Sequence, residues 1–157
     1  MGYNIIDLID KAITITIKRK TIYKNIGDEK SSGPRIKIMS KVFIKEIDET
    51  ILYYKKLKEE IADKSPEEIN FGIYDKMSFL INEFNKKTYI TNTTNIKGYL
   101  KFSLDLEKDV FSLLIDLQGR FVKTEDDTRT KTYKILSCII KNKTRQIEML
   151  ETVLNKF

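Results

Sequence analysis

The sequence contains no histidine, one cysteine, two prolines and six glycines. Without histidine the chain lacks the commonest general base at neutral pH and the commonest side-chain ligand for zinc, copper and non-haem iron. The single cysteine, Cys138, excludes an internal disulfide. The scarcity of proline and glycine argues against a small all-β sandwich rich in turns and favours a helix-rich protein.

Long apolar runs are also missing. No stretch approaches the ~18 to 20 apolar residues that a membrane-spanning helix needs, because even the isoleucine-rich start is interrupted by Asp7, Asp10 and Lys11. No N-terminal stretch combines basic residues, a long apolar run and a small-residue cleavage site. We therefore expect a cytoplasmic protein with no membrane-spanning segment.

The residues that are present suit one globular domain. The 157 residues, of which 41% are hydrophobic and 33% charged, are enough to bury a core without a metal or a disulfide, so we expect a single domain over residues 1–157. Lysine and arginine outnumber aspartate and glutamate by 29 to 23, and the net charge of +6 favours polyanionic partners. A lysine-rich composition explains the same surplus, and we prefer that explanation.

Apolar residues recur at spacings of three and four, which predicts amphipathic helices. The expected helices cover about residues 5–26, 35–62, 66–86, 96–117 and 124–155. Within the first of them, residues Ile13 to Ile17 alternate isoleucine with threonine and are all β-branched, which by itself indicates a strand. We favour a helix because the spacing of three and four continues on both sides. Gly119 is expected to end the fourth segment.

The segment 66–86 differs from the others in its place along the chain. Ser65-Pro66-Glu67-Glu68 has the pattern of a helix start, with proline at the first helical position. Residues 63–95 join two helical hairpins and are long enough to run back along the bundle, as in bundles with one crossover connection. The sequence therefore predicts an all-α four-helix bundle whose long crossover contains a short helix.

Residues 37–57, KIMSKVFIKEIDETILYYKKL, resemble the second helix of the rubrerythrin and ferritin-like family. Ala12-Ile13 and Ile22-Tyr23 resemble its first helix, and residues 106–109 and 139–147 resemble its third and fourth. The resemblance covers most of the chain and implies a ferritin-like four-helix bundle. In that family, four carboxylates and two histidines converge from four helices to bind two iron ions.

Carried over to this chain, the resemblance leaves most of the di-iron site without its ligands. The corresponding positions are Thr16 in the first helix, Ile47 and Thr50 in the second, Glu107 in the third, and Lys143 and Gln146 in the fourth. Only Glu107 is a residue of the expected type. The resemblance therefore implies a degenerate di-iron site, and we expect no cofactor.

A physical replacement for the metal follows from these positions. Lys143 occupies a ligand position, and Glu107 would otherwise be a lone charge in the core. We hypothesise that a Lys143–Glu107 ion pair, assisted by Thr16, Thr50 and Gln146, stands in for the metal centre. In the alternative, Lys143 extends to solvent and Glu107 meets a polar neighbour or water.

Other polar patterns have both a functional and a structural interpretation. The triplet Glu125-Asp126-Asp127 could bind a divalent cation, but carboxylates next to a helix start more often complement the helix dipole. Cys138 flanks a core stripe, which favours a packed thiol over a nucleophile.

Several basic clusters suggest a phosphate-binding surface, on which Tyr53 and Tyr54 could stack bases. Solvated helix faces explain most of these charges, and the tyrosines lie on the apolar stripe, so we disfavour nucleic-acid binding. The clusters are Lys18-Arg19-Lys20, Lys55-Lys56 with Lys58, and Lys141 with Lys143 and Arg145.

These observations favour a non-catalytic ferritin-like bundle that acts through self-association, as a homodimer, or through a protein partner. No catalytic residue is expected. In the alternative, Glu46 and Glu107, joined by Asp10 or Asp48, form a residual carboxylate metal site. A basic bundle that binds polyanions is the third possibility.

Overall fold

The computed structural model describes residues 2–89 and 95–157 of the chain. This described part is 82% helical and contains five α-helices and no strands, which confirms the all-α expectation. The helices are α1 (Ile5–Asp28), α2 (Pro34–Ala62), α3 (Phe71–Lys86), α4 (Ile96–Phe121) and α5 (Lys131–Leu154), with a short 3-10 helix, η1 (Glu125–Arg129), before α5.

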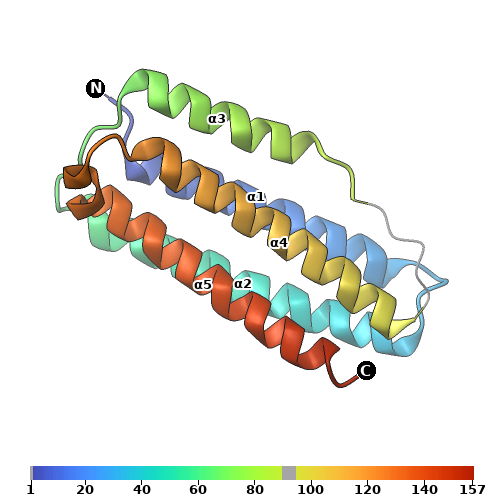
Figure 1. Cartoon of the computed structure of the whole chain (residues 1–157). Helices are drawn as coiled ribbons and strands as arrows, with labels where there is room; N and C mark the ends of the chain where they lie inside the picture. Colours follow the sequence, from blue (N-terminus) through green and yellow to red (C-terminus); the bar gives the residue numbers. More distant parts are fainter. Residues whose placement is uncertain (1, 90–94) are drawn as a thin grey trace.

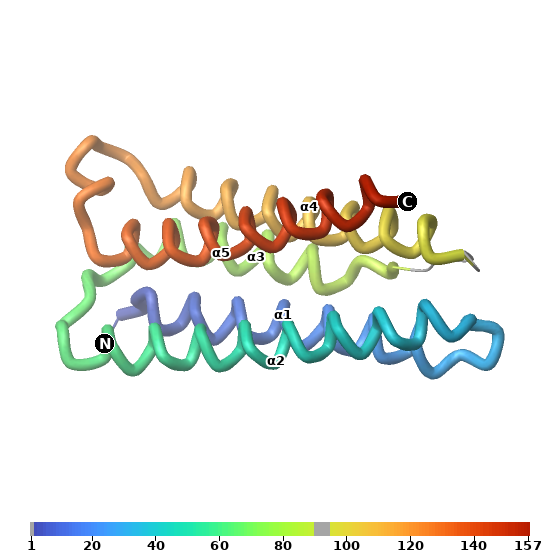
Figure 2. Tube along the Cα trace, turned by 90° about the horizontal axis from the view of Figure 1, so that it is seen from below, coloured from blue at the N-terminus to red at the C-terminus, as the bar shows by residue number. Residues whose placement is uncertain are grey.

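The long helices form two antiparallel hairpins, α1 with α2 and α4 with α5, which pack against each other as two layers (Figure 2). The remaining helix, α3, lies along the side of the bundle formed by α1 and α4 (Figure 1). It returns the chain to the end of the bundle at which α2 began. As a consequence, α2 and α4 run in the same direction.

The ambiguous segment Ile13–Ile17 is helical, because α1 is continuous through it. A capping box with both of its hydrogen bonds is present at the start of α1. The Asn4 side chain accepts the Ile6 N–H at 2.8 Å, and the Asp7 side chain accepts the Asn4 N–H at 2.9 Å. Burial of one face of α1 in the bundle outweighs the weak preference of β-branched residues for strands.

Three helix boundaries differ from the expected ones. The Ser65–Glu68 pattern does not start a helix. Helix α3 begins at Phe71, and the Asn70 side chain caps it by accepting the N–H groups of Gly72 and Ile73. Gly119 does not end α4, which continues to Phe121. The segment 124–155 is divided into η1 and α5, with Thr130 accepting the Tyr133 N–H at the start of α5.

Glu67, which belongs to the expected start pattern at residues 65–68, caps a different helix from the one expected. Its carboxylate accepts the N–H groups of Lys131 and Thr132, at 3.0 and 3.1 Å, and so caps the start of α5 rather than that of α3. The backbone hydrogen bonds lower the pKa of Glu67, although its partial burial acts in the opposite direction.

An aromatic group fills the core near the turn between α1 and α2. The ring of Phe43 lies 4.8 Å from that of Tyr23 and 5.6 Å from that of Tyr99, measured between centroids. Ser40 and the Tyr99 hydroxyl share a hydrogen bond of 2.6 Å, which gives the buried phenol a polar partner. These contacts fix the two layers at the end of the bundle next to the polar site.

Candidate functional site

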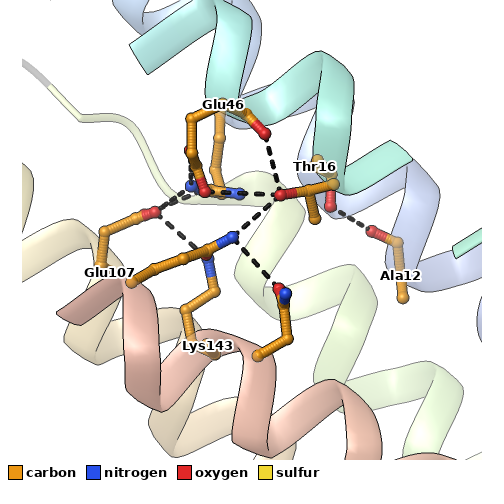
Figure 3. Close-up of polar contacts among 9 residues, drawn as sticks. Ala12, Thr16, Glu46, Glu107 and Lys143 are labelled. Atoms are coloured by element: carbon orange, nitrogen blue, oxygen red, sulfur yellow. Dashed lines mark hydrogen bonds and ion pairs between the residues drawn. The ribbon is translucent and has the colours of Figure 1, made fainter. Parts of the chain in front are cut away.

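The centre of the bundle holds a group of four charged side chains, one from each of the four long helices. They are Arg19 of α1, Glu46 of α2, Glu107 of α4 and Lys143 of α5, and Figure 3 labels the last three. We call this group the ionic cluster. Arg19 is 2% exposed, Glu107 is 4% exposed and Lys143 is fully buried. Buried charges of this kind are rare in proteins unless they are paired.

Glu107 is the centre of the ionic cluster because both buried cations contact it. Arg19 donates from Nε to Oε2 at 2.8 Å and forms an ion pair with Oε1 through its Nη2 atom. Lys143 Nζ lies 3.3 Å from the same Oε1 atom. Arg19 also reaches Glu46, at a longer distance of 3.5 Å between Nη2 and Oε2.

A chain of neutral side chains continues from Lys143. Its ammonium donates to Gln146 Oε1 at 2.7 Å, and the Gln146 amide donates to Thr50 Oγ1 at 2.9 Å. Thr50 in turn donates to the backbone carbonyl of Glu46 at 3.0 Å. Each buried polar group along this chain therefore has a partner, which removes most of the penalty for placing it in the core.

Burial and charge act against each other in the pKa values of the cluster. Burial favours the neutral form of Glu107, but Arg19 and Lys143 outweigh it, so that the pKa of Glu107 is lowered. For Lys143, burial is the largest effect and Arg19 adds to it, which lowers its pKa to about 8. Burial also raises the pKa of Glu46, since its contacts with cations are weaker.

An open cavity of about 230 Å³ adjoins the ionic cluster, between α2 and α5. The charged group at its floor that solvent reaches is Glu46, whose side chain is 32% exposed. Apolar side chains form the walls, and they are Met39, Val42 and Phe43 of α2 with Met149, Leu150 and Val153 of α5. The cavity is thus an apolar groove with a polar floor.

The structure brings together four of the six positions singled out by the family resemblance. Lys143 and Glu107 are in contact, as hypothesised, and Thr50 and Gln146 belong to the same network. Thr16 is buried, but its hydroxyl donates to the Ala12 carbonyl of its own helix at 2.8 Å (Figure 3). Ile47 is a fully buried core residue.

Arg19 is the site residue that the sequence analysis missed. It stood in the basic cluster Lys18-Arg19-Lys20, but these three side chains point to different surroundings. Lys18 donates to carbonyls at the end of α3, and Lys20 pairs with Asp48 on the surface. The available signal was spacing, because Arg19 follows Ile15 and precedes Tyr23 by four residues each on the buried face of α1.

The alternative metal site does not form around Glu46 and Glu107. Asp10 and Asp48, which were to complete it, pair instead with Lys58 and Lys20 on the surface, each at 2.8 Å. Over residues 2–89 and 95–157, no three His, Cys, Asp or Glu side chains gather in a way that could hold a metal ion.

The acidic triplet has the structural role that was favoured. Asp127 accepts the N–H groups of Lys123 and Thr124 at 2.7 and 2.8 Å, and these bonds lower its pKa. Glu125 and Asp126 lie close to Arg129.

Tyr54 is buried, as its place on the apolar stripe predicted. The expectation of a packed thiol was wrong. Cys138 lies between two positions whose side chains face inward, but its own side chain is exposed.

No protein family, curated protein or solved structure matches this chain. The ferritin-like resemblance therefore rests on the residues of the chain itself. In the described part of the chain, no helix combines the length and the apolar character needed to cross a membrane.

Proposed function

We propose that this chain is a non-catalytic bundle of the ferritin-like type, in which cations of the protein occupy the place of a di-iron centre, and that it acts by self-association. One observation carries the first part: Arg19 and Lys143 both contact Glu107, the residue that corresponds to a metal ligand. The parallel direction of α2 and α4, which α3 connects along the chain, supports the ferritin-like assignment, because one-crossover bundles share this direction.

The residues of the cluster do not fit a pair of iron ions. Ferrous ions require several carboxylate oxygens, with histidine nitrogens in addition. Here the oxygens of Glu107 already accept from two cations, and a metal ion would lie next to both positive charges in a medium of low polarity. Tight binding of iron would therefore require Arg19 and Lys143 to leave.

Iron loading tests the non-catalytic assignment. The untagged protein is incubated with excess ferrous iron without oxygen, desalted, and measured by elemental mass spectrometry. We expect near-zero iron, manganese and zinc per chain. One or two tightly held metal ions per chain, lost in the variant Glu107→Gln, would contradict the assignment.

Exposed apolar side chains support the self-association. Ile38, Val42 and Leu52 of α2 are 62%, 53% and 66% exposed, and Met149 of α5 is 69% exposed. Burying such side chains contributes about 25 cal/mol per Å² of apolar surface, which a second protein surface would provide. Sedimentation velocity over a series of concentrations measures the self-association, and a monomer at every concentration would contradict the proposal.

A second candidate function is the binding of a small apolar molecule in the α2–α5 cavity. Glu46 favours this function, because within residues 2–89 and 95–157 its half-buried carboxylate makes only long contacts, with Arg19 at 3.5 Å and with Thr50 at 3.4 Å. Two carboxylates and two cations already balance the charge, so a neutral hydroxyl donor suits the floor best. A cavity of 150 Å³ holds benzene, and by that scale 230 Å³ holds about nine non-hydrogen atoms.

A single-ring alcohol, 2-phenylethanol, is a suitable probe of the cavity. We expect it to raise the unfolding temperature of the wild-type protein, and the variant Met149→Trp, which fills the mouth, to abolish the rise. Ile115→Trp, an exposed position on α4 away from the cavity lining, is the control. An unchanged unfolding temperature in the wild type would exclude this candidate.

A further inference from the structure

Helix α2 carries a second repeating pattern on the side that faces away from the bundle. Six exposed residues follow one another at alternating spacings of four and three, which is the spacing of a coiled-coil seam. They are Ile38, Val42, Lys45, Glu49, Leu52 and Lys56. We call this set the outer seam. It lies two residues out of phase with the buried positions Ile36, Ser40, Ile47, Thr50 and Tyr54, and so on the opposite face of the helix.

No other helix of the described chain covers the outer seam, although one of its residues, Val42, also lines the α2–α5 cavity. The one helix outside the two hairpins, α3, packs on α1 and α4 and lies on the far side of the bundle from α2 (Figure 1). Three of the six seam residues are large and apolar and more than half exposed. A seam of this composition is more apolar than a solvated helix face requires.

The two central charges of the outer seam, Lys45 and Glu49, have opposite signs and lie two residues on either side of residue 47. When a second α2 is placed antiparallel about residue 47, Val42 faces Leu52 of the other copy and Lys45 faces Glu49. Ile38 then faces the long aliphatic stem of Lys56. A two-fold axis repeats each pair, because in such an interface residue i contacts j and j contacts i.

Other arrangements of two α2 helices lose this match. A parallel pair in register would place Lys45 against Lys45 and Glu49 against Glu49, and like charges in contact disfavour association. Shifting the antiparallel pair by one heptad would place Lys45 against Lys56, or Val42 against Lys45. Neither Lys45 nor Glu49 has an ion pair within residues 2–89 and 95–157, so both are available to a partner.

From this charge complementarity we propose that the partner of the outer seam is a second copy of the same chain, packed with its α2 antiparallel and centred on residue 47. The proposal rests on the proposed self-association and specifies its surface, its direction and its register. The two Lys45–Glu49 pairs fix the register, and the Val42–Leu52 contacts supply the apolar burial.

Charge exchange tests the register directly. Lys45→Glu places four carboxylates at the centre of the dimer, and Glu49→Lys places four ammonium groups there. Each is expected to weaken dimerisation by about tenfold or more at low salt, where screening is small. The double variant restores both pairs and the wild-type dissociation constant. A mixture of the two single variants forms a one-to-one heterodimer more tightly than either forms a homodimer.

Lys101→Glu and Asp105→Lys are the matched controls. They exchange charges of the same signs at the same spacing on exposed positions of α4, outside the outer seam. Both are expected to leave the dissociation constant within about twofold of the wild type, measured by sedimentation velocity. These exposed positions carry no buried contact, so all variants are expected to fold, which circular dichroism checks.

The outcomes separate this proposal from the one on which it rests. A wild-type chain that is monomeric up to about millimolar concentration, the range of very weak complexes, would overturn both. A dimer that is equally insensitive to seam and control variants would overturn the outer seam alone and leave self-association through another surface. A dimer weakened by either single variant but not restored by the double variant would overturn the antiparallel register.

Discussion

At the scale of the residue, Glu107 determines how the core tolerates charge. Its carboxylate is the common partner of Arg19 and Lys143, and the glutamate at this position was evident from the sequence because it lies on the buried face of α4. The Lys143–Glu107 contact could also be predicted. Arg19 was missed, because a basic residue between two lysines has the local pattern of a solvated surface, and only its spacing of four residues from Ile15 and Tyr23 sets it apart.

Glu107→Gln is expected to destabilise the protein strongly, because it leaves two buried cations with Glu46 as their nearest remaining carboxylate. Loss of one partner from a buried ion pair typically costs ~3 to 5 kcal/mol. Asp105→Asn, an exposed carboxylate two residues away on the same helix, is the control and is expected to change the free energy of unfolding by less than about 0.5 kcal/mol. Urea denaturation measures both, and equal losses would show that the cluster does not hold the core together.

Lys143 makes stability depend on pH in a defined direction. Its pKa falls from 10.5 in the unfolded chain to about 8 in the folded protein. Between these values the unfolded chain binds more protons, so the free energy of unfolding rises as the pH rises from 8 toward 10. Between pH 8 and 9.5, the free energy of unfolding of the wild type should rise by about 1 kcal/mol or more relative to that of Lys143→Met. A flat difference between the two proteins over this range would contradict the shift.

At the scale of the element, apolar spacing predicted all five helices, since burial of one face decides where a helix forms. Boundaries were less predictable. The carboxylate of Glu67 caps α5, which follows it by more than sixty residues, and no local pattern contains that contact. Gly119 did not end α4, because a glycine in a helix costs only about 1 kcal/mol relative to alanine.

Two glycines within helices provide a test of packing between elements. A Cβ atom on Gly27 would lie 2.8 Å from the Cβ of Ser40, whereas one on Gly119 would meet nothing within 4 Å. Gly119→Ala is therefore expected to stabilise the protein by about 0.5 to 1 kcal/mol through helix propensity alone. Gly27→Ala is expected to destabilise it, because α1 and α2 must separate. Thermal unfolding distinguishes the two, and a gain for both would show that α1 and α2 do not approach so closely.

At the scale of the whole molecule, two layers of two helices enclose an ionic cluster, and α2 presents the outer seam to the outside. The all-α class followed from composition and periodicity. The cavity between α2 and α5 did not, because it depends on how far apart the two hairpins pack. The outer seam also became evident only from the structure, when α3 was found on the other side of the bundle.

The central claim is that the protein's own cations, and no metal ion, hold the centre of the bundle. Urea denaturation of the wild-type chain, in a metal chelator and in excess ferrous iron without oxygen, tests it most directly. The same free energy of unfolding is predicted in both, because Arg19 and Lys143 already complete the cluster. A ligand that binds the folded state at about 100 times its dissociation constant stabilises it by ~2.7 kcal/mol. A gain of that size in iron would contradict the claim.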